Sequence, residues 1–83
     1  MRSLTKEQAF DARVMMFLAG QDPMRCTEIA EGMEENEFDV RRSLIRLMDR
    51  GEVFKQYLKH TAKPDYYYER ARGGYSPTGG DAA

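Results

Sequence analysis

The chain has one cysteine, one histidine and no long apolar run, and each scarcity excludes a class of protein. Cys26 alone closes no intrachain disulfide, and Cys26 with His60 cannot supply the roughly three or four ligands of a zinc site. No stretch approaches the length of a membrane helix, which needs about 18 consecutive apolar residues. The N-terminus also lacks the charged, apolar and small-residue regions of a secretory signal. We therefore expect a cytoplasmic protein with no metal, no cofactor and no membrane contact.

Motifs for catalysis are also scarce. No pattern pairs a nucleophile with a base. The glycine pairs at 73–74 and 79–80 precede no Lys-Ser or Lys-Thr step, so they do not form a phosphate-binding loop. Cys26 is interpreted as a small, partly buried residue, although Arg25 and a helix N-terminus beside it would also suit a redox-sensing thiol. We expect that the protein is not an enzyme.

The length of 83 residues suits one domain. The last residues, 73–83, are rich in Gly, Ser, Pro and Ala and show no apolar period, which predicts a disordered tail. Residues 1–72 are then expected to form the single folded domain. A domain this short buries only about 60% of its unfolded surface, so we expect modest stability.

Charge is distributed unevenly, although the net charge is only -1. Residues 25–39 contain six acidic side chains and one arginine, whereas residues 40–72 contain nine basic and four acidic ones. This asymmetry predicts a polarised surface, with one end suited to phosphate and the other repelling it or facing a basic partner. The alternative is that both segments are ordinary solvated faces.

Three helices are predicted. The first runs from Thr5 to about Ala19, because Thr5 and Gln8 have the spacing of a capping box and apolar residues recur at helical intervals. The second is short, from Glu28 to Met33, with its cap at Cys26 or Thr27. The third begins at the N-cap Asn36, ends near Arg50, and is followed by Gly51 in a left-handed conformation. Four methionines are interpreted as core residues: Met15, Met16, Met33 and Met48.

A β-hairpin is predicted after Gly51. Residues 53–58 (VFKQYL) are β-prone, residues 59–65 (KHTAKPD) form a loop with turn residues, and a second strand runs from Tyr66 to about Arg70. Of the three consecutive tyrosines that open this strand, one or two are expected to pack on the helices. The fold class is therefore α+β and mostly α: three helices and a C-terminal two-stranded hairpin.

The spacing of apolar residues from the second helix onward resembles the core pattern of winged helix-turn-helix domains. The pattern is E-I-A, a Leu-like residue, a Val, two leucines and Gly-x-Val, which here are residues Glu28, Ile29, Ala30, Met33, Val40, Leu44, Leu47, Gly51 and Val53. The resemblance covers about residues 5–70. It implies a winged helix-turn-helix fold and a module that usually binds double-stranded DNA, although a shared fold alone does not determine what is bound.

Within that class the chain resembles the small fimbrial phase-variation regulators (PapI/FaeA-like), which are also short chains without added dimerisation helices. The shared features are an aromatic at the place of Phe38, basic residues near Lys59 and His60, and aromatics that open the last strand. MarR-like and ArsR-like domains are similar in the core but usually carry further helices.

The second helix of such a pair enters the major groove with its first turns nearest the bases. Here that helix is 36–50, and its arginines would reach phosphates or guanine. The basic hairpin loop, 59–65, would act as the wing on the adjacent backbone. The predicted DNA-binding residues are Asn36, Glu37, Phe38, Arg41, Arg42, Ser43, Arg46, Lys55, Lys59, His60 and Lys63.

Two features oppose this interpretation. Glu34, Glu35, Glu37 and Asp39 crowd the end of the helix that would face the groove; they favour the helix N-terminus but repel phosphate, unless Glu37 or Asp39 accepts a hydrogen bond from cytosine. Phe38 and Ile45 also share one outward stripe. They suit contacts with thymine methyl groups, or a protein interface, and Phe38 would alternatively fold under the wing and complete the core.

The leading hypothesis is a DNA-binding transcriptional regulator. A single recognition helix seldom binds tightly alone, so we expect a homodimer on a two-fold site, with Met15 and Met16 as a candidate dimer face, or cooperation with a larger DNA-binding protein. The rival hypothesis is a winged-helix protein-interaction module, such as a phage or plasmid accessory factor. It would not bind DNA and would dock through Phe38, Ile45 and the acidic turn.

Overall fold

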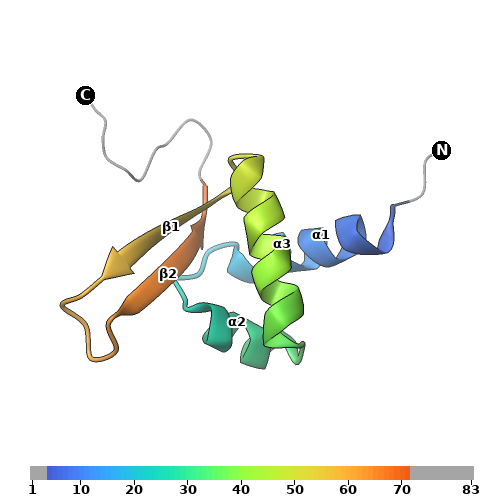
Figure 1. Ribbon diagram of the computed structural model, residues 1–83. Helices are drawn as coiled ribbons and strands as arrows, with labels where there is room; N and C mark the ends of the chain where they lie inside the picture. The colour runs from blue at the N-terminus through green and yellow to red at the C-terminus, as the bar shows by residue number, and fades with distance from the viewer. Residues whose placement is uncertain (1–3, 72–83) are drawn as a thin grey trace.

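Three helices and one hairpin follow one another in the computed structural model, which describes residues 4–71. The helices are α1 (Lys6–Leu18), α2 (Cys26–Met33) and α3 (Glu37–Asp49), and the strands are β1 (Val53–Leu58) and β2 (Asp65–Arg70). The hairpin projects from the helices with its loop at the far end (Figure 1). The expected mostly helical α+β fold is confirmed, whereas the predicted tail at 73–83 lies outside the described residues.

Local capping chemistry determines where α1 and α3 begin. The Thr5 side chain accepts from the Gln8 amide, and the Gln8 side chain accepts from the Thr5 amide, both at 3.0 Å, which confirms the capping box. Asn36 accepts from the amides of Phe38 and Asp39 at 2.7 and 3.3 Å. Gly51 follows α3 with φ of 75°, a left-handed conformation that glycine adopts without strain. Helix α3 therefore begins and ends where the sequence predicts.

The start of α2 differs from the prediction. Its N-cap is Arg25, whose backbone amide donates to Glu28 at 2.9 Å, and Cys26 is the first helical residue. Cys26 is buried, with its thiol 3.7 Å from the Glu37 carbonyl oxygen, so it does not act as a cap. Burial raises the pKa of the Cys26 thiol and thereby opposes the thiolate that redox sensing requires.

The core lies where α3 crosses α1 and α2. Its buried side chains include Val14 and Leu18 from α1, Ile29 from α2, and Val40 and Leu44 from α3. These are the apolar positions that the helical spacing predicted. Three of the four methionines expected in the core, Met15, Met33 and Met48, pack against it, but Met16 is exposed and its assignment to the core is wrong.

The hairpin is attached to the helices at its base. Val53 pairs with Arg70 and Leu58 with Asp65, so the second strand begins one residue earlier than predicted. Val53 and Tyr68 are buried against the helices. An additional bridge joins Met24 to Tyr68 through two backbone hydrogen bonds of 2.9 and 2.7 Å. This bridge fixes the wing to the segment between α1 and α2, and no sequence pattern predicts it.

Gly32 lies inside α2, where alanine normally stabilises a helix by about 1 kcal/mol. Here a Cβ would overlap the tip of the Phe17 ring from α1. We therefore expect Gly32→Ala to give no gain and to lower the free energy of unfolding by about 1 kcal/mol as the ring is displaced. Urea titrations of Gly32→Ala, alone and with Phe17→Leu, check this. A full helical gain in the single variant would contradict the packing described.

Candidate nucleic-acid interface

The outward face of α3 carries an alternating apolar and basic stripe. Phe38 is 61% exposed, Arg42 and Ile45 are also exposed, and the Arg42 guanidinium lies 5.7 Å from the centroid of the Phe38 ring. The interpretation in which Phe38 folds under the wing and completes the core is therefore wrong. This face is compatible both with contacts to thymine methyl groups and with a protein interface. Because Phe38 supports the Arg42 side chain, the cation is held near the first turns of the helix.

Arg41 lies on the flank of α3 that faces the hairpin. It is exposed and forms an ion pair with Glu37, one turn earlier, at 3.0 Å. An exposed pair of this kind contributes little to stability and exchanges readily for another partner. The Arg41 side chain can therefore reorient toward another anion without loss of packing.

Ser43 and Arg46 do not belong to the outward face, which corrects their assignment to the DNA-binding set. Ser43 is fully buried and its hydroxyl donates to Asp11 of α1. Arg46 donates to the same carboxylate through Nε at 3.0 Å and through a terminal nitrogen at 2.7 Å. The physical reason is that Asp11, only 2% exposed, requires partners for its charge, and α3 supplies them. This arrangement joins α1 to α3 and occupies Arg46.

The ionisation of Asp11 reflects these contacts. Burial by itself raises the pKa of this carboxyl, but hydrogen bonds from Arg46 and Ser43 and the positive charges of Arg46 and Arg50 outweigh it, so the pKa is lowered. The hydrogen bond with Asp11 correspondingly raises the pKa of Arg46. Asp11 is therefore charged at neutral pH and acts as a structural ion within the helix pair.

The hairpin loop presents the predicted basic residues to solvent. Lys59, His60 and Lys63 are all exposed. The Tyr67 hydroxyl donates to the Lys63 carbonyl oxygen at 2.8 Å, so the loop is tied to β2 even though it extends away from the helices (Figure 1). Two lysine side chains are thus exposed at the far end of the wing.

A group of side chains that the sequence interpretation largely overlooked lies on the hairpin between its loop and its base. Tyr57 and Tyr66 are cross-strand partners, 53% and 47% exposed, with ring centroids 5.2 Å apart in an edge-to-face arrangement. The Lys55 ammonium lies 4.7 Å from the centroid of the Tyr66 ring. Only Lys55 of the three was among the predicted site residues. Strand alternation places Lys55 and Tyr57 on one face, which was the available signal, and the pairing register adds Tyr66 to that face.

The acidic turn before α3 is partly neutralised. Glu35 forms an ion pair with Arg13 of α1 at 2.8 Å, and Glu37 is paired with Arg41. Glu34 has a left-handed backbone with φ of 58°, which reverses the chain between the two helices. Asp39 is exposed beside Arg42. The repulsion expected between this turn and phosphate is therefore smaller than the sequence count suggests.

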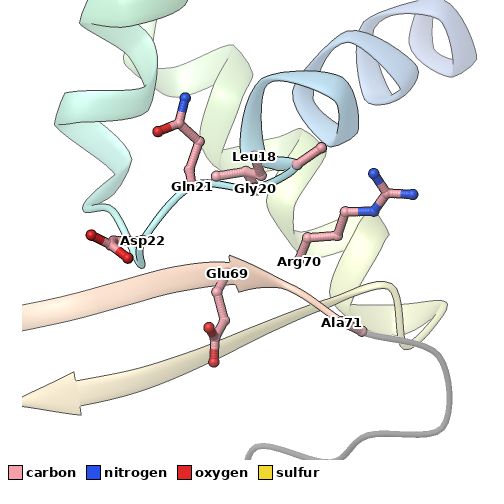
Figure 2. A pocket seen from close by; sticks show the side chains of 8 residues that line it. Leu18, Gly20, Gln21, Asp22, Glu69, Arg70 and Ala71 are labelled. Carbon is pink, nitrogen blue, oxygen red and sulfur yellow. The ribbon is translucent and has the colours of Figure 1, made fainter.

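A separate pocket of about 370 Å³ lies between the α1–α2 connection and the end of β2. Figure 2 shows Arg70 extending toward the end of α1, whereas Glu69 points to the other side of its strand. The pocket is away from the exposed stripe of α3. Within residues 4–71 no group of three His, Cys, Asp or Glu side chains is placed to hold a metal ion. None of the helices described there is long and apolar enough to span a membrane.

Comparison with known proteins agrees on the fold. No family model matches the chain, and a search of curated proteins finds no match. Among solved structures, the apo-Zalpha domain of zebrafish PKZ is similar, with a TM-score of 0.72 and 16% identity over 82% of this chain and 100% of that one. A likeness at that identity shows a shared winged-helix fold and no more. The narrower resemblance to fimbrial phase-variation regulators stays a prediction.

Proposed function

We propose that the chain binds double-stranded DNA, with α3 in the major groove and the hairpin loop beside the adjacent backbone. The observation that carries the proposal is a pair of exposed arginines on α3. Arg41 lies on the side that faces the wing, and Arg42 lies on the outward side. Arginine recognises both phosphate and the acceptor edge of guanine in a bidentate geometry. The lysines of the hairpin loop add contacts that do not depend on base sequence.

The physiological role that fits this activity is transcription regulation by binding rather than catalysis. One recognition helix offers few base contacts, so tight specific binding requires a second copy or a larger DNA-binding partner. Met16 is exposed on α1 and beside it Met15 is half-buried, which keeps this helix available as a dimer face. A cytoplasmic location suits such a regulator and its single free cysteine.

Arg42→Ala tests the proposal most directly. Loss of one phosphate contact lowers affinity and reduces the slope of log affinity against log salt by about 1. We expect this in fluorescence anisotropy titrations of a labelled duplex between about 0.05 and 0.2 M salt. Arg70→Ala is the matched control, because it removes the same charge from β2 beside the α1–α2 connection. Equal effects of the two substitutions, or affinity that ignores salt, would contradict a contact at Arg42.

A protein-interaction module is the second candidate, and the exposure of Phe38 favours it. An aromatic ring beside an arginine is the composition typical of an interface hot spot. In this case the chain has no salt-dependent affinity for duplex DNA, and Phe38→Ala abolishes a protein complex while the fold is retained. The salt titration above therefore separates the two functions with one measurement.

A further inference from the structure

An aromatic and cationic surface lies on the hairpin, and we name it the wing cluster: Lys55, Tyr57 and Tyr66. The register pairs Tyr57 with Tyr66, so both rings lie on the same face of the hairpin. The Tyr66 ring contacts both the ammonium group of Lys55 and the Tyr57 ring, at centroid distances of 4.7 and 5.2 Å. These contacts fix the rings while leaving about half of each exposed to solvent.

The wing cluster is continuous with the flank of α3. Tyr66 and Arg41 line one shallow hollow between the hairpin and the first turns of α2 and α3, with Tyr68 also in its wall. Arg41 in turn directly precedes Arg42 and follows Phe38 by about one helical turn. A nucleic acid strand that contacts α3 therefore passes the wing cluster before it reaches the lysines of the hairpin loop.

The chemistry of the wing cluster differs from that of the loop. The lysines of the loop offer charge alone, whereas the wing cluster adds aromatic faces to a cation. An aromatic face binds a nucleobase by stacking, irrespective of the identity of the base. Bases within a duplex are already stacked on their neighbours, so only an unpaired base has a face to offer.

We propose that the wing cluster binds an unpaired nucleobase next to a duplex, which directs the protein to DNA with a single-stranded segment. Tyr57 supplies the stacking face, Tyr66 holds it in place, and Lys55 with Arg41 neutralises the flanking phosphates. This inference rests on the proposed function, since α3 contacts the neighbouring duplex. It adds to that function a preference for a class of DNA structure.

Three labelled DNAs test the inference by anisotropy at one salt concentration. They are a blunt duplex of about 20 base pairs, the same duplex with a tail of about ten thymidines, and the tailed duplex after its tail has been paired with a complementary strand. We expect the single-stranded tail to increase affinity about five- to tenfold over the blunt duplex. The paired extension adds more phosphates but no unpaired base, so an equal gain there would overturn the inference.

Two substitutions at Tyr57 assign the gain to the wing cluster. Tyr57→Leu keeps apolar bulk but removes the ring, and we expect it to lose the gain from the tail while affinity for the blunt duplex is unchanged. Tyr57→Trp keeps a stacking face, and it introduces the sole tryptophan of the chain. Its emission should be quenched by the tailed DNA and not by the blunt one. Thermal melts of both variants report whether the fold is retained.

The outcomes separate the inference from the function on which it rests. If none of the three DNAs binds, the proposed function is wrong and the inference falls with it. If the blunt duplex binds but the tail adds nothing, or if the gain persists in Tyr57→Leu, the inference alone is overturned. Equal loss of affinity for tailed and blunt DNA in Tyr57→Leu would mean that the rings only support the hairpin, and this also overturns it.

Discussion

Replacing Asp11 by alanine is expected to lower the free energy of unfolding by about 2–3 kcal/mol. Removal of one partner from a buried ion pair typically costs roughly 3–5 kcal/mol, because the other charge is left without compensation. Arg46 is 30% exposed and regains some water, so the loss is smaller. The buried Ser43 hydroxyl also loses its acceptor. For a domain of this size the midpoint of thermal unfolding should fall by about 10–20 °C.

The control for this prediction is an acidic residue outside the ion network. Asp49 is exposed on α3, and Asp49→Ala should change the midpoint by no more than about 4 °C. Asp11→Asn retains a polar group beside Ser43 without the charge, so an intermediate loss is expected. If Asp11→Ala melts at the same temperature as the Asp49 variant, the contacts between α1 and α3 through Asp11 do not stabilise the fold.

Acid should remove the same contribution in the unsubstituted protein. The pKa of Asp11 is lowered in the folded state, so its stabilisation is fully present above the unfolded pKa of about 3.9 and is lost as pH falls through the folded pKa. The difference in unfolding free energy between the native chain and Asp11→Ala should therefore be constant near neutral pH and shrink below about pH 4. Urea titrations across this range check the sign, and a difference that grows in acid would contradict it.

The features that the sequence predicted well are those encoded locally. Asn36 and Gly51 specify the ends of α3 through contacts with their own neighbours in the chain, so no knowledge of the tertiary structure was needed. The hairpin followed from the change of period after Gly51 and from the turn residues of its loop. The spacing of apolar residues on α3 likewise identified Val40 and Leu44 as core residues.

The errors arose where a partner lies far away in the sequence. Asp11 and Arg46 are 35 positions apart, and the helical period of α3 alone placed Arg46 at the edge of the exposed face. The sequence does show that Asp11 is a single acidic residue on the apolar face of α1 that includes Val14. That pattern does not indicate which residue of α3 binds it. Similarly, the register that pairs Tyr57 with Tyr66 on one face of the hairpin, and the burial of Tyr68 on that same face, do not follow from strand alternation alone. The sequence pattern predicted the helices and strands themselves but not the side-chain contacts between them.

Removing both lysines of the hairpin loop is expected to have the largest effect on DNA binding. Lys59 and Lys63 are exposed at the end of the wing farthest from the core, so Lys59→Ala with Lys63→Ala should leave the fold intact. Each neutralised phosphate contributes about 0.9 to the slope of log affinity against log salt. Loss of two contacts should therefore reduce the slope by about 2 and weaken binding about 50-fold at 0.1 M salt, with the difference vanishing toward 1 M.

The position of the charge, rather than its amount, is what this double variant tests. Arg70→Ala removes one positive charge from the base of the hairpin. It should change the logarithm of the affinity by far less than half as much as the double lysine variant, because this group does not approach the phosphates. The double lysine variant should bind all duplex sequences more weakly to the same extent, since a backbone contact carries no base information. If the loss depended strongly on the DNA sequence, the loop would contact base edges in a groove, and the assignment of the wing to the backbone would be wrong.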